Sequence, residues 1–138
     1  MARLAVVTAV NAWLAANWTA TPIVKMNDSE SKPPALGAQY IQATYPLANE
    51  EQVSIGAPGN NRWRETGAFQ IKVYGKRGSG LSDTLTKADA LAALFRGQRI
   101  AADMQCNEAS TAVLQDDNDQ GNYFVAGVIV NYNHDLLG

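Results

Sequence analysis

The chain has 138 residues, of which 46% are hydrophobic and 17% are charged, as is ordinary for one globular domain. Its 11 basic and 13 acidic residues form no long run of either sign, which argues against a nucleic-acid partner held through its phosphates. The only cysteine, Cys106, excludes an internal disulfide and a cysteine cluster for zinc. No apolar stretch approaches the roughly 20 residues of a membrane helix. We therefore expect one soluble domain over residues 1–138, with Cys106 as a small apolar filler.

The N-terminal segment has apolar residues at helical spacing. A positive charge at Arg3 before a short apolar run would also suit a signal peptide. That run is at the lower limit for a signal core, however, and polar and aromatic residues follow it at Asn11, Trp13 and Asn17. We predict a helix over residues 3–17 that lies on the core. Its apolar stripe consists of Leu4, Val7, Val10/Asn11, Leu14 and Trp18.

Prolines and polar residues divide the next segment into short strands. Pro22 prevents helical continuation, and residues 23–26 then predict a short strand. Residues 27–34 are polar and end in two prolines, so we expect a mobile surface loop. Strands over 39–45 and 52–55, separated by 46–51 and followed by a turn at 57–61, predict an antiparallel meander.

Residues 62–97 carry the strongest pattern in the chain. In a strand over 62–74, apolar residues alternate with polar ones, which predicts one buried and one wet face. The apolar face has Gly67, Phe69, Ile71 and Val73, and the polar face has Thr66, Gln70 and Lys72. A helix follows the glycine hinge at 75–80, with its apolar stripe at Leu81, Leu85, Ala88, Ala92 and Phe95. Gly97 is placed to end that helix in the left-handed conformation.

The remaining residues are rich in β-forming side chains. Residues 99–101 predict extended chain, and strands over 109–115 and 123–132 flank a loop at 116–122, which predicts a hairpin. The strand over 123–132 is apolar on both faces, so it should be central or covered by a helix or a neighbouring subunit. The predicted fold class is α+β, a mainly antiparallel β-sheet with two helices packed on one face.

The segment Gly75–Ser82 lies between a strand and a helix, as a phosphate-binding loop would. Leu81 occupies the position where such a loop needs its lysine, and Asp83 stands where the dinucleotide motif needs its third glycine. A flexible hinge before a helix capped by serine fits these residues better. A small-ligand-binding module that uses this hinge stays open as an alternative.

Two other segments resemble binding motifs. Residues 116–121 resemble the start of a calcium loop, but its twelfth position is Gly127 instead of a carboxylate, so we interpret the segment as a solvated hairpin tip. Arg62-Trp63-Arg64 combines cations with an aromatic, as in base stacking. A strand end with Trp63 turned inward uses the same residues, and a protein carboxylate is then the expected contact of the arginines.

The only histidine, His134, has Asp135 as a possible partner, and a Ser/His/Asp site need not be contiguous in the chain. Nothing in the sequence marks a nucleophile, however, and there is no His-x-x-x-His metal pair. We expect no enzyme, no catalytic or metal-binding residues and no cofactor.

Several segments together resemble the tail terminator (tail completion) proteins of long-tailed bacteriophages. They are the strand 68–74, the glycines Gly75-x-x-Gly78-x-Gly80, the helix 88–97 and the closing hairpin with 123–132. A helix ending in Trp18 before a Pro22-Ile-Val strand also fits. The resemblance covers nearly the whole chain.

This resemblance implies a homohexameric ring that caps the head-proximal end of the tail tube, stops its polymerisation and offers a surface for head–tail joining. The implied partners are the tail tube protein and the head–tail connector protein, and the implied place is the virion tail, assembled in the host cytoplasm. Another neck component is the alternative within phage structure. Candidate interface residues are Arg62, Arg64, Lys76, Arg77, Asp116, Asp117 and Asp119. Loops 27–34, 56–61 and 116–122 and the second face of 123–132 are further candidates.

Overall fold

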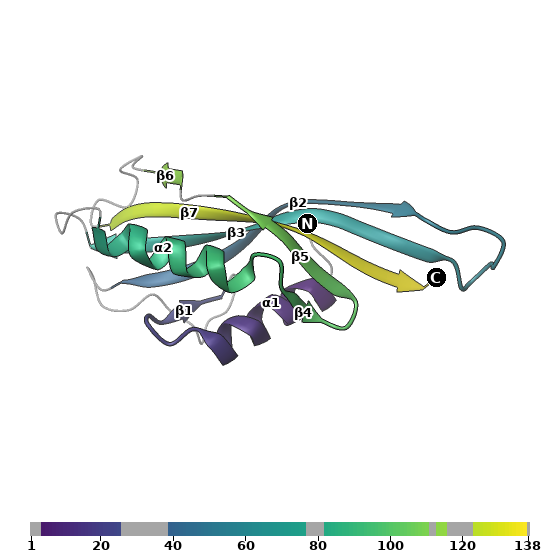
Figure 1. The fold of residues 1–138 in the computed structure, drawn as a ribbon, viewed down its shortest axis with the longest axis horizontal. Coiled ribbons are helices and arrows are strands. Elements are labelled where there is room, and N and C mark those ends of the chain that lie inside the picture. Colours follow the sequence, from purple (N-terminus) through teal and green to yellow (C-terminus); the bar gives the residue numbers. More distant parts are fainter. Residues whose placement is uncertain (1–3, 26–38, 77–81, 111–112, 116–122, 138) are drawn as a thin grey trace.

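The computed structural model describes residues 4–25, 39–76, 82–110, 113–115 and 123–137. These form two helices and seven strands (Figure 1). In chain order they are α1 (Leu4–Asn17), β1 (Ile23–Val24), β2 (Tyr40–Gln52), β3 (Arg62–Lys76), α2 (Ser82–Phe95), β4 (Arg99–Ala101), β5 (Met104–Ala109), β6 (Val113–Gln115) and β7 (Tyr123–Leu137).

All seven strands belong to one sheet, with the order β1-β2-β3-β7-β5-β4 and with β6 paired to β7. Every pairing is antiparallel except that of β1 with β2. The two longest strands, β3 and β7, pair along their whole length, from Arg62 opposite Leu137 to Lys76 opposite Tyr123. The predicted α+β class and the predicted central place of the last strand are both confirmed.

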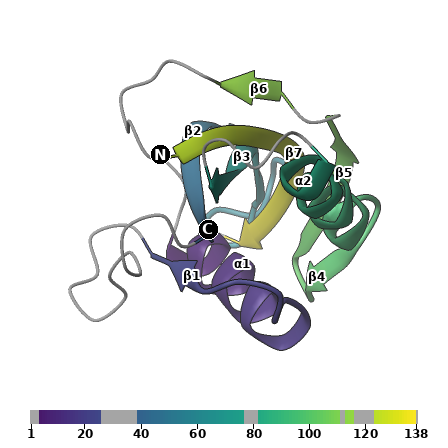
Figure 2. The same cartoon turned by 90° about the vertical axis from the view of Figure 1, so that its left-hand side faces the viewer.

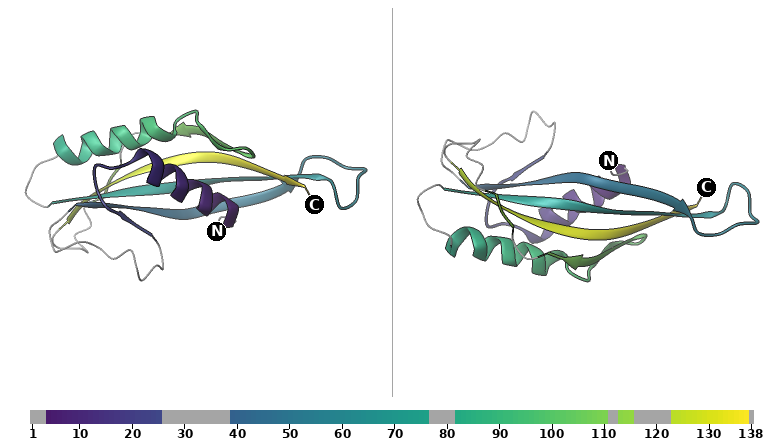
Figure 3. Two further views of the ribbon diagram at one scale, coloured as in Figure 1. Left: turned by 90° about the horizontal axis from the view of Figure 1, so that it is seen from below. Right: turned by 90° about the horizontal axis from the view of Figure 1, so that it is seen from above.

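Both helices cover the same face of the curled sheet (Figures 2 and 3). The alternation in β3 explains why, since its apolar side chains Phe69, Ile71 and Val73 are fully buried in the core that both helices share. The helices contribute the other half of this core with Val6, Val10, Leu14, Ala88, Leu91 and Phe95. Burial of this apolar surface is the main stabilising term of the fold.

The stripe predicted for the first helix is confirmed at Val10, Leu14 and Trp18 and was wrong at its start. Leu4 is 81% exposed, whereas Val6, Val10 and Leu14 are fully buried. The buried positions therefore recur every four residues, and Trp18 continues this series just beyond the helix end. In α2, Ala88, Ala92 and Phe95 are buried as predicted. Near its start Thr84 is buried in place of Leu85, which is half-buried. Gly97 has φ +70°, as its place after the helix predicted.

The prediction of two strands over 39–45 and 52–55 was also wrong. A single strand, β2, runs from Tyr40 to Gln52, with a β-bulge between Thr44 and Leu47. Pro46 lies inside this bulge. Its lack of a backbone N–H therefore removes no hydrogen bond from the ladder between β2 and β3. The short strand predicted at 23–26 is present as β1, which pairs with β2 in parallel at Ile41 and Gln42. The antiparallel pairing predicted for the meander is confirmed between β2 and β3.

The C-terminal third differs from the prediction in its strand boundaries. Strand β5 was not predicted, and β6 covers only the last three residues of the predicted 109–115 strand. The hairpin itself is confirmed, because Val113 pairs with Gly127 and Gln115 with Val125. Strand β7 continues five residues beyond the predicted end, to Leu137. The predicted loops 27–34 and 116–122 and hinge residues 77–80 lie outside the described residues.

A long β-hairpin extends beyond the helices (Figures 1 and 3). We call residues 47–66 the arm: it combines the second half of β2, the connection 53–61 and the first part of β3. Gly56 and Gly59 both have positive φ in the connection, which is closed by a hydrogen bond from Val53 N to Arg62 O of 2.8 Å. Residues 51–60 are all exposed. The last residues of β7 pair with β3 along the arm, so its base is three strands wide.

Candidate assembly surface

The three predicted interface residues in the described part of the chain do not gather in one place. Arg62 and Arg64 lie at the start of β3, on the arm, and Lys76 ends the same strand. With a rise of about 3.3 Å per residue, this separation along β3 amounts to about 46 Å. Arg77, Asp116, Asp117 and Asp119 lie outside the described residues. Of the three candidates that the structure describes, Arg62 and Arg64 are neighbours and Lys76 lies far from them.

Arg64 is held by a carboxylate of its own chain. Its Nε donates to Asp135 Oδ1 at 2.9 Å and its Nη2 to Asp135 Oδ2 at 3.3 Å, a two-point contact between β3 and β7. These hydrogen bonds from Arg64 lower the pKa of Asp135 below its ordinary value. The expected contact of an arginine with a protein carboxylate is confirmed here. Trp63, between the two arginines, is half-buried.

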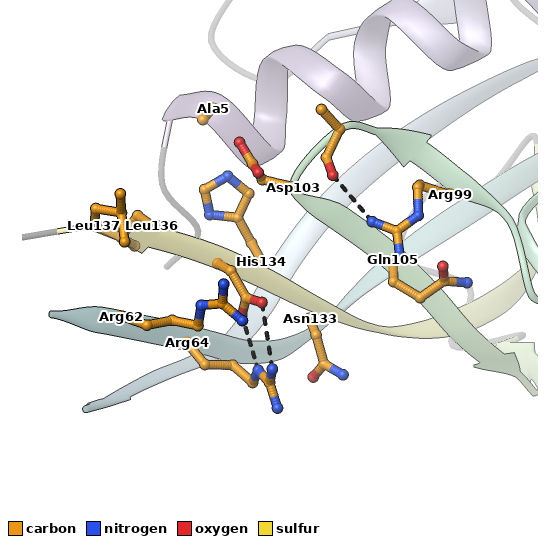
Figure 4. Close-up of a pocket in the computed structure, with 12 residues that line it drawn as sticks. Ala5, Arg62, Arg64, Arg99, Asp103, Gln105, Asn133, His134, Leu136 and Leu137 are labelled. Carbon is orange, nitrogen blue, oxygen red and sulfur yellow. Dashed lines mark hydrogen bonds and ion pairs between the residues drawn. The ribbon is translucent and has the colours of Figure 1, made fainter. Parts of the chain in front are cut away.

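A groove of about 920 Å³ lies beside this ion pair (Figure 4). It is bounded by the start of β3, the β4–β5 turn, the end of β7 and the start of α1. Its lining includes successive residues of β7, and the side chains of successive strand residues point to opposite faces of the sheet. The groove therefore wraps around the free edge of β7. The β7 residues in the lining are Asn133, His134, Asp135, Leu136 and Leu137.

The groove brings together three guanidinium groups and two carboxylates, those of Arg62, Arg64, Arg99, Asp103 and Asp135. Arg99 Nη1 donates to the carbonyl of Ala102 at 3.0 Å, which fixes the β4–β5 turn. The backbone N–H of Asp135 donates to Asp103 O at 3.0 Å and joins that turn to β7. The site is therefore rigid on one side, and its charged side chains lie where a partner can reach them.

His134 and Asp135 do not form a catalytic pair. As successive residues of β7 they point to opposite faces of the sheet. His134 lies on the side of Asp103, and the carboxylate of Asp135 is bound by Arg64 on the other face (Figure 4). The Nδ1 atom of His134 is buried and has no hydrogen-bond partner among the described residues. Asp135 therefore does not orient this imidazole, as a Ser/His/Asp site would require.

A buried polar contact anchors the arm to the core. Tyr132 Oη donates to Glu65 Oε2 at 2.5 Å, and Glu65 is only 3% exposed. Burial, followed by this hydrogen bond, raises the pKa of Tyr132. Burial also raises the pKa of Tyr45 to about 12. Sequence reasoning missed Glu65, although its place on the apolar face, two residues before Gly67 and four before Phe69, was a signal that could have found it.

Large apolar side chains are exposed along the arm and beside it. Ile55 is 87% exposed, Leu137 67%, Leu47 54% and Val53 39%. Exposed apolar groups that gather on one part of a protein commonly mark a surface for another protein. The arm and the groove together form the candidate assembly surface.

The described part of the chain has no group of three or more side chains that could hold a metal ion. None of the described helices has the length and apolar character needed to cross a membrane.

Comparison with known proteins gives a family and a fold. The family model described as phage tail terminator protein matches residues 3–132. No curated protein matches the chain. Among the solved chains that share the fold, one has a TM-score of 0.52 and 20% sequence identity, over 92% of this chain and 88% of the other. Likeness at that level of identity concerns the fold alone.

Proposed function

This chain belongs to the phage tail terminator family, and from that premise we propose that it caps the head-proximal end of the tail tube as a hexameric ring. In that position it stops polymerisation of the tube and offers the surface to which the head–tail connector binds. It acts by adhesion and shape, without catalysis and without a cofactor.

The arm is the observation that carries this proposal. A hairpin that projects beyond the core, with exposed apolar side chains such as Ile55 and Val53 near its tip, suits contact with another protein. Repetition of one heterologous contact around a closed rotation produces a ring. Capping further requires that only one end of the ring be complementary to the tube subunit, and we assign the arm tip to that end.

Tail length is the direct test. Phage that lacks this protein is expected to make tubes of uncontrolled length that do not join capsids, as seen by electron microscopy. Tails of uniform length that join capsids in its absence would refute the proposal. A head–tail connector, the alternative, would leave tail length normal and block joining only.

One position on the arm tests the assigned contact. Because Ile55 is 87% exposed, Ile55→Asp should leave thermal unfolding of the isolated protein unchanged and should lower the yield of finished tails. Ile55→Leu keeps an apolar side chain and is the matched control, which should give a normal yield. Equal yields from the two variants would remove the arm tip from the tube contact.

A further inference from the structure

At the base of the arm the sheet has two edges that face opposite ways. Strand β2 forms one edge, β3 the middle and β7 the other edge, as the register Glu51, Arg64, Asp135 across the three strands shows. Neighbouring strands lie about 4.8 Å apart, so the two edges are about 10 Å apart. Because β2 and β7 both run antiparallel to β3, they run in the same direction. A second copy placed alongside in the same orientation would bring its β7 edge against this β2 edge.

The β2 edge is open and acidic. Its neighbour β1 pairs only with Ile41 and Gln42, so no other described strand covers the outer side of residues 47–52. This stretch has two acidic residues, Glu50 and Glu51, and no basic one. Leu47, at its start, is 54% exposed. An uncovered strand edge of this kind is a template for pairing with another chain.

The β7 edge is open and rich in arginine. The ladder with β5 ends at His134, and the bond from Asp135 N–H to Asp103 O closes it. Among the described strands, Leu136 and Leu137 then have only β3 as a neighbour. Arg62 and Arg99 lie in the groove beside this edge, and both residues are exposed. The carboxylate of Asp135 is already bound to Arg64.

We propose that neighbouring copies of this chain join side by side, the acidic β2 edge of one copy docking into the arginine-lined groove at the end of β7 of the next. This inference rests on the proposed ring and names the surfaces that build it. The charges on the two edges determine which edges can pair. Two β2 edges facing each other would bring glutamate against glutamate. Two facing grooves would each carry an excess of positive charge, because each has three guanidinium groups and two carboxylates. Only the contact between unlike edges is complementary, and such a contact generates a ring and not a two-fold dimer.

Two charge-reversed variants test this contact. The edge variant carries Glu50→Lys and Glu51→Lys, and the groove variant carries Arg62→Glu and Arg99→Glu. Each variant alone is expected to reduce the yield of finished tails at least roughly tenfold in extracts that lack the wild-type protein, because like charges then meet in every contact. Arg99 also fixes a turn, so Arg62→Glu alone is a second groove variant that leaves that turn intact.

An equal mixture of the two variants gives the decisive result. In a ring in which they alternate, each lysine edge meets a glutamate groove and each wild-type edge meets a wild-type groove. The mixture should therefore restore the yield to within about twofold of wild type, since every contact is again between opposite charges. The matched controls are Asp89→Lys and Arg96→Glu, exposed residues on and just after α2. Each control alone should give normal tails.

The outcomes separate this contact from the proposed function. If each variant melts like wild type and still completes tails, or if the mixture stays inactive, the contact is wrong while the function stands. If tail length is normal without any of this protein, the function itself is wrong, whatever the variants do.

Discussion

The hydroxyl of Tyr132 is the sharpest test of how the arm is held to the core. It donates to the buried carboxylate of Glu65 at 2.5 Å, and a hydrogen bond to a charged group contributes about 1.5–3 kcal/mol to stability. Tyr132→Phe removes this bond and keeps the ring, whose burial is complete. We expect the free energy of unfolding to fall by about 2 kcal/mol.

Tyr45 provides a matched control for the same chemical change. Its Oη is also buried but has no hydrogen-bond partner among the described residues. A buried hydroxyl without a partner opposes folding through its desolvation, so its removal is neutral or stabilising by up to about 1 kcal/mol. Tyr45→Phe should therefore match or exceed wild-type stability, whereas Tyr132→Phe should fall below it.

Urea unfolding at pH 7 measures both variants. Because neither substitution changes the surface exposed on unfolding, the slope against urea should stay constant and only the midpoint should move. For a chain of this size, a loss of 2 kcal/mol lowers the melting temperature by about 6 °C. Equal stability losses in the two variants, or a loss under about 0.5 kcal/mol for Tyr132→Phe, would refute the assignment of this bond as the anchor of the arm.

Three further predictions concern backbone packing, thiol reactivity and pH. Gly67→Ala should destabilise by more than about 2 kcal/mol in urea unfolding, because a Cβ there would clash with the carbonyl of Leu47 and the hydroxyl of Tyr132. Burial raises the pKa of the Cys106 thiol to about 12, so a thiol reagent at pH 8 should label it only as fast as the protein unfolds, and prompt labelling would contradict its burial. The pKa of Tyr45 is likewise raised to about 12 from 10.0. As the pH rises, the unfolded chain releases the phenol proton of Tyr45 before the folded chain does, so the free energy of unfolding should fall between pH 10 and 12. Urea unfolding across this range measures that fall, which should be smaller in Tyr45→Phe.

Local patterns in the sequence were sufficient for the parts of the fold that depend on periodicity. The alternation in β3 determines its buried face, and the helical spacing before Gly97 places α2 correctly to within one residue. These signals hold because the core lies on one side of each element. Family membership could also be predicted from the order of strand, glycines, helix and closing hairpin, and the family model that matches residues 3–132 confirms it.

The errors arose where a neighbouring strand decides the structure. Pro46 suggested a break, but its place on a little-paired edge let β2 continue through a bulge. In β5 the alternation of apolar and polar residues covers only Met104 to Asn107, which is too short to predict a strand, and pairing with β7 orders the segment. Similarly, the pair Arg64–Asp135 and the groove join residues that are distant in the chain. No local pattern contains that information, because it requires the register of β3 against β7.

The full-length pairing of β3 with β7 has a consequence for how the protein is made. The two strands share 15 paired positions, yet β7 is the last strand in chain order, so the ribosome completes β3 long before its partner exists. Until then β3 has β2 on one side and a bare edge on the other, and contacts between segments so distant in the chain form slowly. The nascent chain is consequently open to misassociation during that interval, and damage to the final strand should yield insoluble protein instead of a smaller folded one.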